Sequence, residues 1–251
     1  MSIYVDHMGR QSPDKYACFR ANGIDGVCRY LDGGRVSRKG LLREEAEDIS
    51  RAGLRIHTVY ETSGGADIEG FPPNGDYFTR EQGRRDWLEA VVDATRAGQP
   101  RGYPIYLAVD RHMPPEDPRL DAYFGGALSA DVSLGASGYH LGCYGPDYVC
   151  RFVRDALGVT HLWPWLPRPP GRPDFDFDLW QYENGASVCG VAVDYNECRL
   201  KGWTLMPEEL VTREELEAYQ AEVRATLEAM KAVEIRAIEA LRAIRDALED
   251  I

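Results

Sequence analysis

The chain has 251 residues, of which 44% are hydrophobic and 10% aromatic. This composition excludes intrinsic disorder, and the length matches the ~250 residues typical of one (β/α)₈ barrel. The net charge of −12 argues against non-specific nucleic-acid binding, because phosphate neutralisation requires clustered cations, and no apolar run approaches the ~18 residues of a membrane-spanning helix.

Strand-like and helix-like segments alternate from the first residues onward. Strands are predicted where β-branched and aromatic residues cluster, over Ser2–Asp6, Gly26–Tyr30, Leu54–Glu61, Tyr103–Asp110, Gly138–Tyr144, His161–Leu166, Phe177–Tyr182 and Gly190–Asp194. Helices are predicted between them, over Pro13–Ala21, Leu41–Ala52, Thr79–Ala97, Leu120–Leu134 and Pro146–Leu157. The near-continuous apolar run of Tyr103–Asp110 is typical of a strand buried on both faces of a parallel sheet.

Eight strands separated mostly by helices predict an α/β fold of the (β/α)₈ barrel type. A doubly wound dinucleotide-binding sheet is less well supported, since no GxGxxG motif follows the first strand. The proline-rich linker WLPRPPGRPDFD replaces a helix between the sixth and seventh strands. One unit of the barrel is therefore expected to be degraded.

The last part of the chain differs from the rest, so we expect a barrel over residues 1–206 and a separate segment over 207–251. That segment has no glycine, has no proline after Pro207 and is rich in Ala, Glu, Arg and Leu, which predicts one long helix. Apolar residues recur in heptads, at Leu216, Val223, Met230, Ala237, Ile244 and Ile251, with Leu227, Leu241 and Leu248 between them. The helix is expected to make the protein a homo-oligomer; the alternative is that it folds back on the barrel.

The six cysteines show no CxxC spacing and no zinc-site signature. Cys189 and Cys198 flank a short predicted strand and could form a disulfide in an oxidising compartment; buried free thiols are the alternative. Only four of the 29 basic residues are lysines, which we interpret as the mark of a GC-rich coding sequence, actinobacterial or from a phage of such a host.

Carboxylates stand at the ends of four predicted strands, and functional groups of such barrels gather at the C-terminal strand ends. They are Asp6, Glu61, Asp110 and Asp194. Converging carboxylates repel one another, which raises at least one pKa and creates an acid beside a base, as glycoside hydrolysis requires. Aromatic rings that suit sugar faces stand near other strand ends, at Tyr30, Tyr60, Tyr144, Trp163 and Trp180.

Each of these residues also has a structural interpretation. A strand-end aspartate can cap the next helix or pair with an arginine. Arg29 could pair with a carboxylate only to hold the barrel together, and His112 is expected in a solvated loop.

Several stretches resemble the glycoside-hydrolase-like domains of actinobacterial exported proteins and phage lysins, which are distant relatives of the family 25 lysozymes. They are GVCRYL from Gly26, LLREEAEDISRAGLRIHTVYE to Glu61, GYPIYLAVD to Asp110, YHLGCYG around Tyr144, DLWQY with Gln181, and GVAVD to Asp194. The resemblance covers Ser2 to Asp194 and implies a (β/α)₈ barrel. It also implies that Asp6, Glu61, Asp110, Gln181 and Asp194 line the mouth.

The chain departs from family 25 at the D-x-E motif, whose glutamate donates the proton in those lysozymes. The corresponding segment is Asp110-Arg111-His112, so that glutamate is missing. We therefore expect Glu61 to act as the acid and Asp110 as the base or stabiliser, with Asp6 and Asp194 as electrostatic support. Tyr30, Tyr144, Trp163 and Gln181 are the expected sugar contacts.

The sequence thus predicts a peptidoglycan-directed glycosidase that uses no cofactor or metal. One alternative is a catalytically silent barrel that binds cell-wall glycan in a virion or surface assembly. Another is a metal-dependent hydrolase that uses Glu61, Asp110 and His112. We expect no nucleic-acid partner and no membrane insertion. No Sec or Tat signal is expected, so the protein would act at the wall only if a phage or a non-Sec route delivers it, and in the cytoplasm otherwise.

Overall fold

The computed structural model describes residues 2–33, 39–62, 77–114, 116–133, 137–165 and 171–205. Eight strands close into a barrel in chain order. They are β1 (Ser2–Asp6), β2 (Gly26–Leu31), β3 (Arg55–Tyr60), β4 (Pro104–Ala108), β5 (His140–Pro146), β6 (His161–Trp165), β7 (Leu179–Val188) and β8 (Val191–Cys198). The expected α/β barrel is confirmed.

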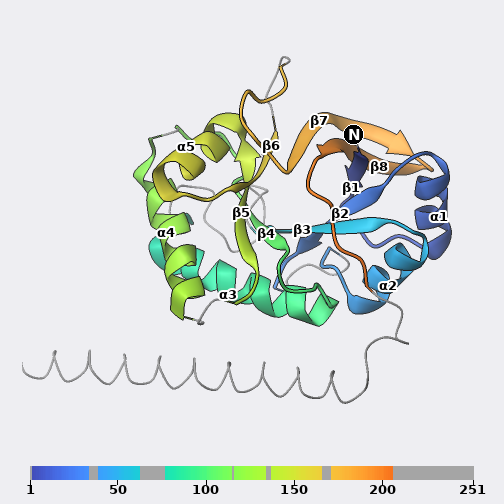
Figure 1. Cartoon of the computed structure of the whole chain (residues 1–251), viewed down its shortest axis with the longest axis horizontal. Helices are drawn as coiled ribbons and strands as arrows, with labels where there is room; N and C mark the ends of the chain where they lie inside the picture. The colour runs from blue at the N-terminus through green and yellow to red at the C-terminus, as the bar shows by residue number, and fades with distance from the viewer. Residues whose placement is uncertain are drawn as a thin grey trace, which may run out of the picture. The chain divides into compact units, whose positions relative to one another are not determined.

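Five helices are found among the described residues and cover much of the barrel wall (Figure 1). They are α1 (Pro13–Ala21), α2 (Arg43–Arg51), α3 (Arg80–Ala97), α4 (Pro118–Ser133) and α5 (Asp147–Leu157). The start of α3 is fixed locally, because the Thr79 side chain accepts a hydrogen bond from the Gln82 backbone at 3.1 Å. No described helix is long and apolar enough to cross a membrane.

Glycines let α3 and α4 approach each other closely. A Cβ atom on Gly83 would lie 1.8 Å from the backbone oxygen of Tyr123, and one on Gly126 would lie 2.0 Å from that of Arg80. Both contacts are far shorter than atoms allow, so any side chain at either position would push the two helices apart.

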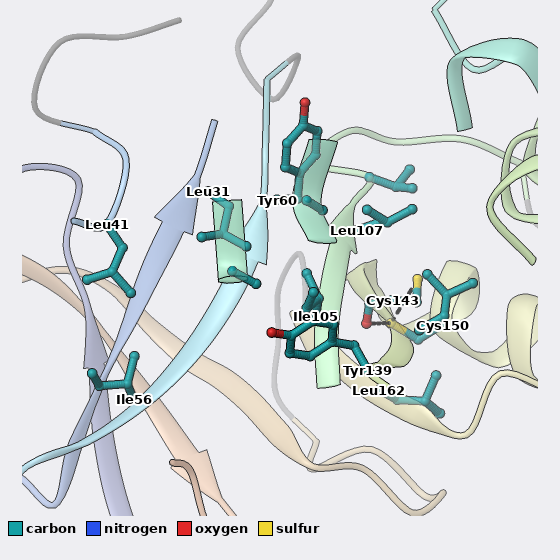
Figure 2. Close-up of a cluster of buried hydrophobic side chains, with 14 of the residues drawn as sticks. Leu31, Leu41, Ile56, Tyr60, Ile105, Leu107, Tyr139, Cys143, Cys150 and Leu162 are labelled. Atoms are coloured by element: carbon teal, nitrogen blue, oxygen red, sulfur yellow. Dashed lines mark hydrogen bonds between the residues drawn. The ribbon is translucent and has the colours of Figure 1, made fainter. Parts of the chain in front are cut away.

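Side chains alternate along each strand between two buried layers. The outer layer lies between the barrel and its helices, and Figure 2 shows part of it, including Leu107 of β4 and the Cys143–Cys150 contact between β5 and α5. The inner layer fills the barrel itself, with Tyr4, Cys28, Val59, Tyr106, Ala108, Trp163, Leu179 and Cys198. This alternation decides which side chains reach the mouth.

The last two strands break the parallel pattern. Each of β1 to β6 pairs in parallel with the next strand, but β8 is antiparallel to both β7 and β1. The cause is the two-residue turn Cys189–Gly190, in which both residues have positive φ (56° and 73°), as a tight hairpin turn requires. The predicted end of the last strand at Asp194 is therefore wrong, since β8 continues to Cys198.

The disulfide of the described structure joins Cys18 of α1 to Cys189 in the hairpin turn, with Cα atoms 6.1 Å apart. The Cys189–Cys198 pairing considered from the sequence is therefore wrong, and Cys198 is a buried free thiol. Cys189 lies in the turn that leads into β8 and Cys198 ends that strand, so the two cysteines lie at opposite ends of an extended segment, too far apart for a bridge. The disulfide links the β7–β8 hairpin to the helix layer.

Two predictions fall partly or wholly outside the described residues. In the proline-rich linker, residues 171–178 contain no helix, and residues 166–170 lie outside the described part, so the degraded unit stays a prediction. Residues 206–251 also lie outside it, so the long helix over 207–251 stays a prediction.

Candidate functional site

Inward-pointing polar side chains meet at the barrel end where β1 to β6 terminate. We call this end, with Asp6, Glu61, Asp110 and Asp194, the carboxylate mouth. The charges of Glu61 and Asp194 act on both Asp6 and Asp110, so all four carboxylates lie within mutual electrostatic range. The structure therefore brings together the four carboxylates that were predicted from the sequence.

Asp6 ends β1 and is 6% exposed. Its carboxylate accepts hydrogen bonds from Asn196 Nδ2 at 2.8 Å and from the Tyr30 hydroxyl at 3.4 Å. Burial, and the negative charge of Asp194 to a smaller degree, raise the pKa of Asp6 to about 7, although the Asn196 hydrogen bond opposes the shift. Asp6 thus exchanges a proton near neutral pH.

The orientation of Asn196 is fixed by the barrel core beneath it. Trp163 Nε1, which can only donate, donates to Asn196 Oδ1 at 2.7 Å, so the amide nitrogen must face Asp6. Trp163 itself is 1% exposed and packs against Tyr144 and Tyr106. The expectation that Trp163 contacts a sugar does not fit this burial; its place is to hold Asn196.

Glu61 directly follows β3 and forms an ion pair with Lys39 Nζ at 3.2 Å. Lys39 also lies over the ring of Tyr30, 4.5 Å from its centroid. Both charged side chains are largely buried, at 10% and 12% exposure, so the attraction is weakly screened. Glu61 is therefore the carboxylate of the mouth that has a neighbouring cation as its ion-pair partner.

Asp110 follows β4 and is exposed at the mouth. Its carboxylate accepts no hydrogen bond from the residues that the structure describes. Desolvation and the negative charge of Glu61 raise its pKa to about 6, against a smaller opposite effect of Lys39. The mouth thus holds an acid with a raised pKa beside an ion-paired carboxylate.

Asp194 reaches the mouth by a route that was not predicted. It lies in the middle of β8 and is the register partner of Asp6, so both side chains point to the same, inner face of the sheet. Gln181 Nε2 donates to Asp194 at 2.8 Å, and Gln181 Oε1 accepts from the Tyr144 hydroxyl at 2.7 Å. The Gly185 amide donates to the other Asp194 oxygen at 2.6 Å. Gln181 therefore links Tyr144 to Asp194.

Three other residues considered from the sequence point away from the mouth. Arg29 forms a fully buried ion pair with Glu45 of α2 at 2.8 Å, which confirms the structural interpretation of Arg29. Tyr60 donates to Glu89 of α3, and Trp180 packs against the outer layer. Alternation along the strands places all three on the outside of the barrel.

The metal-dependent alternative finds no ligand set among the described residues, where no three His, Cys, Asp or Glu side chains are grouped to hold an ion. His112 instead contacts the Tyr148 hydroxyl at 2.8 Å.

Two residues of the mouth were not predicted. Asn196 is two positions after Asp194 and shares its face, so a longer β8 would have revealed it. Lys39 lies in the β2–α2 connection, where no periodic pattern marks an inward side chain.

Replacing Asp6 tests its buried charge. We expect Asp6→Asn to raise the free energy of unfolding by about 2–4 kcal/mol at pH 8 and to leave it unchanged at pH 4. The folded protein binds the Asp6 proton more tightly than the unfolded chain does. The free energy of unfolding of the unmutated protein therefore falls as pH rises from about 4 to about 7, by up to ~1.4 kcal/mol per pH unit. Urea unfolding of the variant and the unmutated protein between pH 4 and pH 8 measures this difference in the free energy of unfolding. A difference that does not vary with pH would contradict the raised pKa.

The chain is similar to a known domain family and to other bacterial proteins. The family model of the Rv2525c-like, glycoside hydrolase-like domain matches residues 17–187. Two uncharacterised Bacillus subtilis proteins are similar: YbfG, 31% identical over 158 residues, and FadG, 29% identical over 155 residues. The matches cover 59% and 60% of this chain but only 20% and 26% of those proteins.

Solved structures share the fold. The Tat-secreted Mycobacterium tuberculosis protein Rv2525c, in complex with L-tartrate, aligns with a TM-score of 0.63 at 23% identity over 82% of this chain and 97% of that one. A lysozyme from Streptomyces coelicolor aligns with a TM-score of 0.51 at 12% identity, over 79% of this chain and 92% of that one. At these identities the likeness concerns the fold alone.

Proposed function

The chain belongs to the Rv2525c-like, glycoside hydrolase-like domain family, and from this membership we propose that its carboxylate mouth binds and hydrolyses cell-wall glycan. The observation that carries the proposal is the pair formed by Asp110, whose raised pKa is about 6, and Glu61, which is ion-paired with Lys39. Glycoside hydrolysis requires one protonated carboxyl and one ionised carboxylate on either side of the bond.

The proposed roles of the two carboxylates reverse the expectation from the sequence. Asp110 protonates the leaving glycosidic oxygen, because its proton remains bound at a pH where ordinary aspartates are ionised. Glu61, the ion-pair partner of Lys39, stabilises the positive charge that develops on the sugar ring or activates a water molecule. Asp6 and Asp194 add negative charge, and the hydrogen bonds of Asn196 and Gln181 hold them in place.

A catalytically silent glycan-binding barrel is the second candidate, and the Lys39–Glu61 ion pair favours it. A lysine that occupies Glu61 reduces the ability of this carboxylate to act on a substrate. The same mouth would then bind glycan through its polar groups without cleaving it.

Purified peptidoglycan distinguishes the two candidates. We expect the protein to release new reducing ends from it, with a rate that falls as pH rises through about 6, because Asp110 loses its proton there. Co-sedimentation with the wall without new reducing ends would support the silent barrel. If the protein neither binds peptidoglycan nor releases reducing ends from it, both candidate functions are overturned.

We further propose that the protein acts outside the reducing cytoplasm. The Cys18–Cys189 disulfide is typical of oxidising compartments, and the structurally similar Rv2525c is a Tat-secreted protein. Self-association through residues 207–251 is proposed as well, from their heptad pattern.

A further inference from the structure

Three aromatic rings lie together at the C-terminal ends of three neighbouring strands. His112 follows β4, Tyr148 lies in the first turn of α5 after β5, and Trp165 ends β6. The rings of His112 and Tyr148 are stacked, with centroids 6.4 Å apart, and the Trp165 ring meets His112 edge-on at 5.7 Å. They form one surface, which we call the aromatic shelf.

The shelf adjoins the carboxylate mouth on two sides. His112 is two residues after Asp110 in the same loop. Trp165 is the register partner of Gln181, whose amide holds Asp194. A ligand that extends from Asp110 toward β6 would therefore pass onto these rings.

The shelf also has a hollow of a suitable size. His112, Met113, Pro114 and Tyr148 line a surface hollow of about 470 Å³, within the ~300–1,000 Å³ range of small-molecule sites. None of these four residues carries a fixed charge, so this part of the surface favours a neutral ligand over an ionic one. A pyranose ring suits it, because its apolar face packs on aromatic carbon while its hydroxyls reach the polar edges of the imidazole and phenol.

We propose that the aromatic shelf binds a neutral N-acetylhexosamine ring of the glycan chain, beyond the sugar whose bond lies at Asp110. The proposal rests on the proposed function, since it takes the same glycan as the occupant of the mouth. It explains why an exposed histidine stands two residues after the acid and is oriented by its 2.8 Å contact with the Tyr148 hydroxyl.

Chain-length dependence of binding tests the shelf. The protein used is the full chain carrying Asp110→Asn, so that the ligands are not consumed, and the probes are the dimer and the hexamer of β-1,4-linked N-acetylglucosamine. We expect His112→Ala and Tyr148→Ala each to weaken hexamer binding by about tenfold, the scale of one lost ring contact, and to change dimer binding by less than twofold. Titration calorimetry measures both.

Two further variants serve as controls. Tyr148→Phe keeps the ring and should bind the hexamer within threefold of its parent. Tyr182→Ala removes an exposed tyrosine, 43% accessible, that lies on β7 outside the shelf, and should change nothing. Unfolding curves establish that each variant is folded. Because His112 is exposed, His112→Ala is expected to disturb the fold less than Tyr148→Ala does.

The outcomes separate the shelf from the proposed function. Hexamer affinity that His112→Ala and Tyr148→Ala leave unchanged overturns the shelf, as does an equal loss for dimer and hexamer, or no hexamer binding by the parent. If the unmutated protein still releases reducing ends from peptidoglycan in those cases, the proposed function stands without the shelf. Ring-dependent hexamer binding without any hydrolysis supports the shelf and leaves the silent barrel as the function.

Discussion

Asp110→Asn is expected to lower the release of reducing ends from peptidoglycan by at least a hundredfold. A general acid contributes ~10²–10⁴-fold to a rate, and an amide has no proton to give to the leaving oxygen. At pH 4 stability should change by less than about 0.5 kcal/mol, since the Asp110 side chain is exposed and accepts no hydrogen bond within the described part of the chain. At pH 8 the variant should be the more stable protein, because the amide does not carry the charge that the raised pKa of Asp110 shows to be unfavourable in the fold. Reducing-end assays and urea unfolding measure the two quantities.

The matched control is Asp176→Asn, which removes another exposed carboxylate. Asp176 precedes β7 and so lies toward the opposite end of the barrel, where it forms a long 3.7 Å ion pair with Arg199. Its replacement should leave the rate within twofold. If Asp110→Asn keeps its activity while Glu61→Gln loses it, the assignment of the acid to Glu61 from the sequence is correct and the reversed roles are wrong.

Much of the carboxylate mouth could be predicted because two regularities act together. Parallel strands end at the same side of a barrel, and alternate residues along each strand point inward. Asp6, Glu61 and Asp110 satisfy both, which is why strand-end position alone was enough to find them. Tyr60 and Trp180 satisfy only the first, and the structure places both outside the barrel.

The rest of the site depends on contacts between residues far apart in the chain. The composition of a strand does not reveal which strands it pairs with or how far that pairing extends. The last strand was therefore predicted to end at Asp194, and Asn196 was missed. The disulfide partners are 171 residues apart, and nothing near Cys18 marks Cys189 as its partner. Lys39 follows β2 and Glu61 follows β3, so their ion pair joins residues 22 positions apart that no local pattern connects.

Arg29 shows how the outer layer supports the mouth. Its guanidinium pairs with Glu45 and donates to the backbone oxygens of His7 at 2.8 Å and Lys39 at 3.0 Å. These carbonyls belong to the connections that follow β1 and β2, so one buried side chain holds two loops of the mouth. Through its hold on the Lys39 backbone, it also positions the ammonium that pairs with Glu61.

Arg29→Met is therefore expected to lower the free energy of unfolding by about 3–5 kcal/mol, because it leaves the Glu45 carboxylate buried without a cation. The double variant Arg29→Met/Glu45→Leu removes that charge and should recover part of the loss, but not the hydrogen bonds to His7 and Lys39. The control is Arg51, which is 67% exposed and pairs with Glu47 at 3.4 Å and with Asp48. Arg51→Met should cost less than about 1 kcal/mol, because ion pairs of an exposed side chain contribute little. Urea unfolding of the three variants measures these changes in the free energy of unfolding. A loss below about 1 kcal/mol for Arg29→Met would show that the buried ion pair does not stabilise the barrel. A full recovery in the double variant would show that the hydrogen bonds to the two loops contribute nothing.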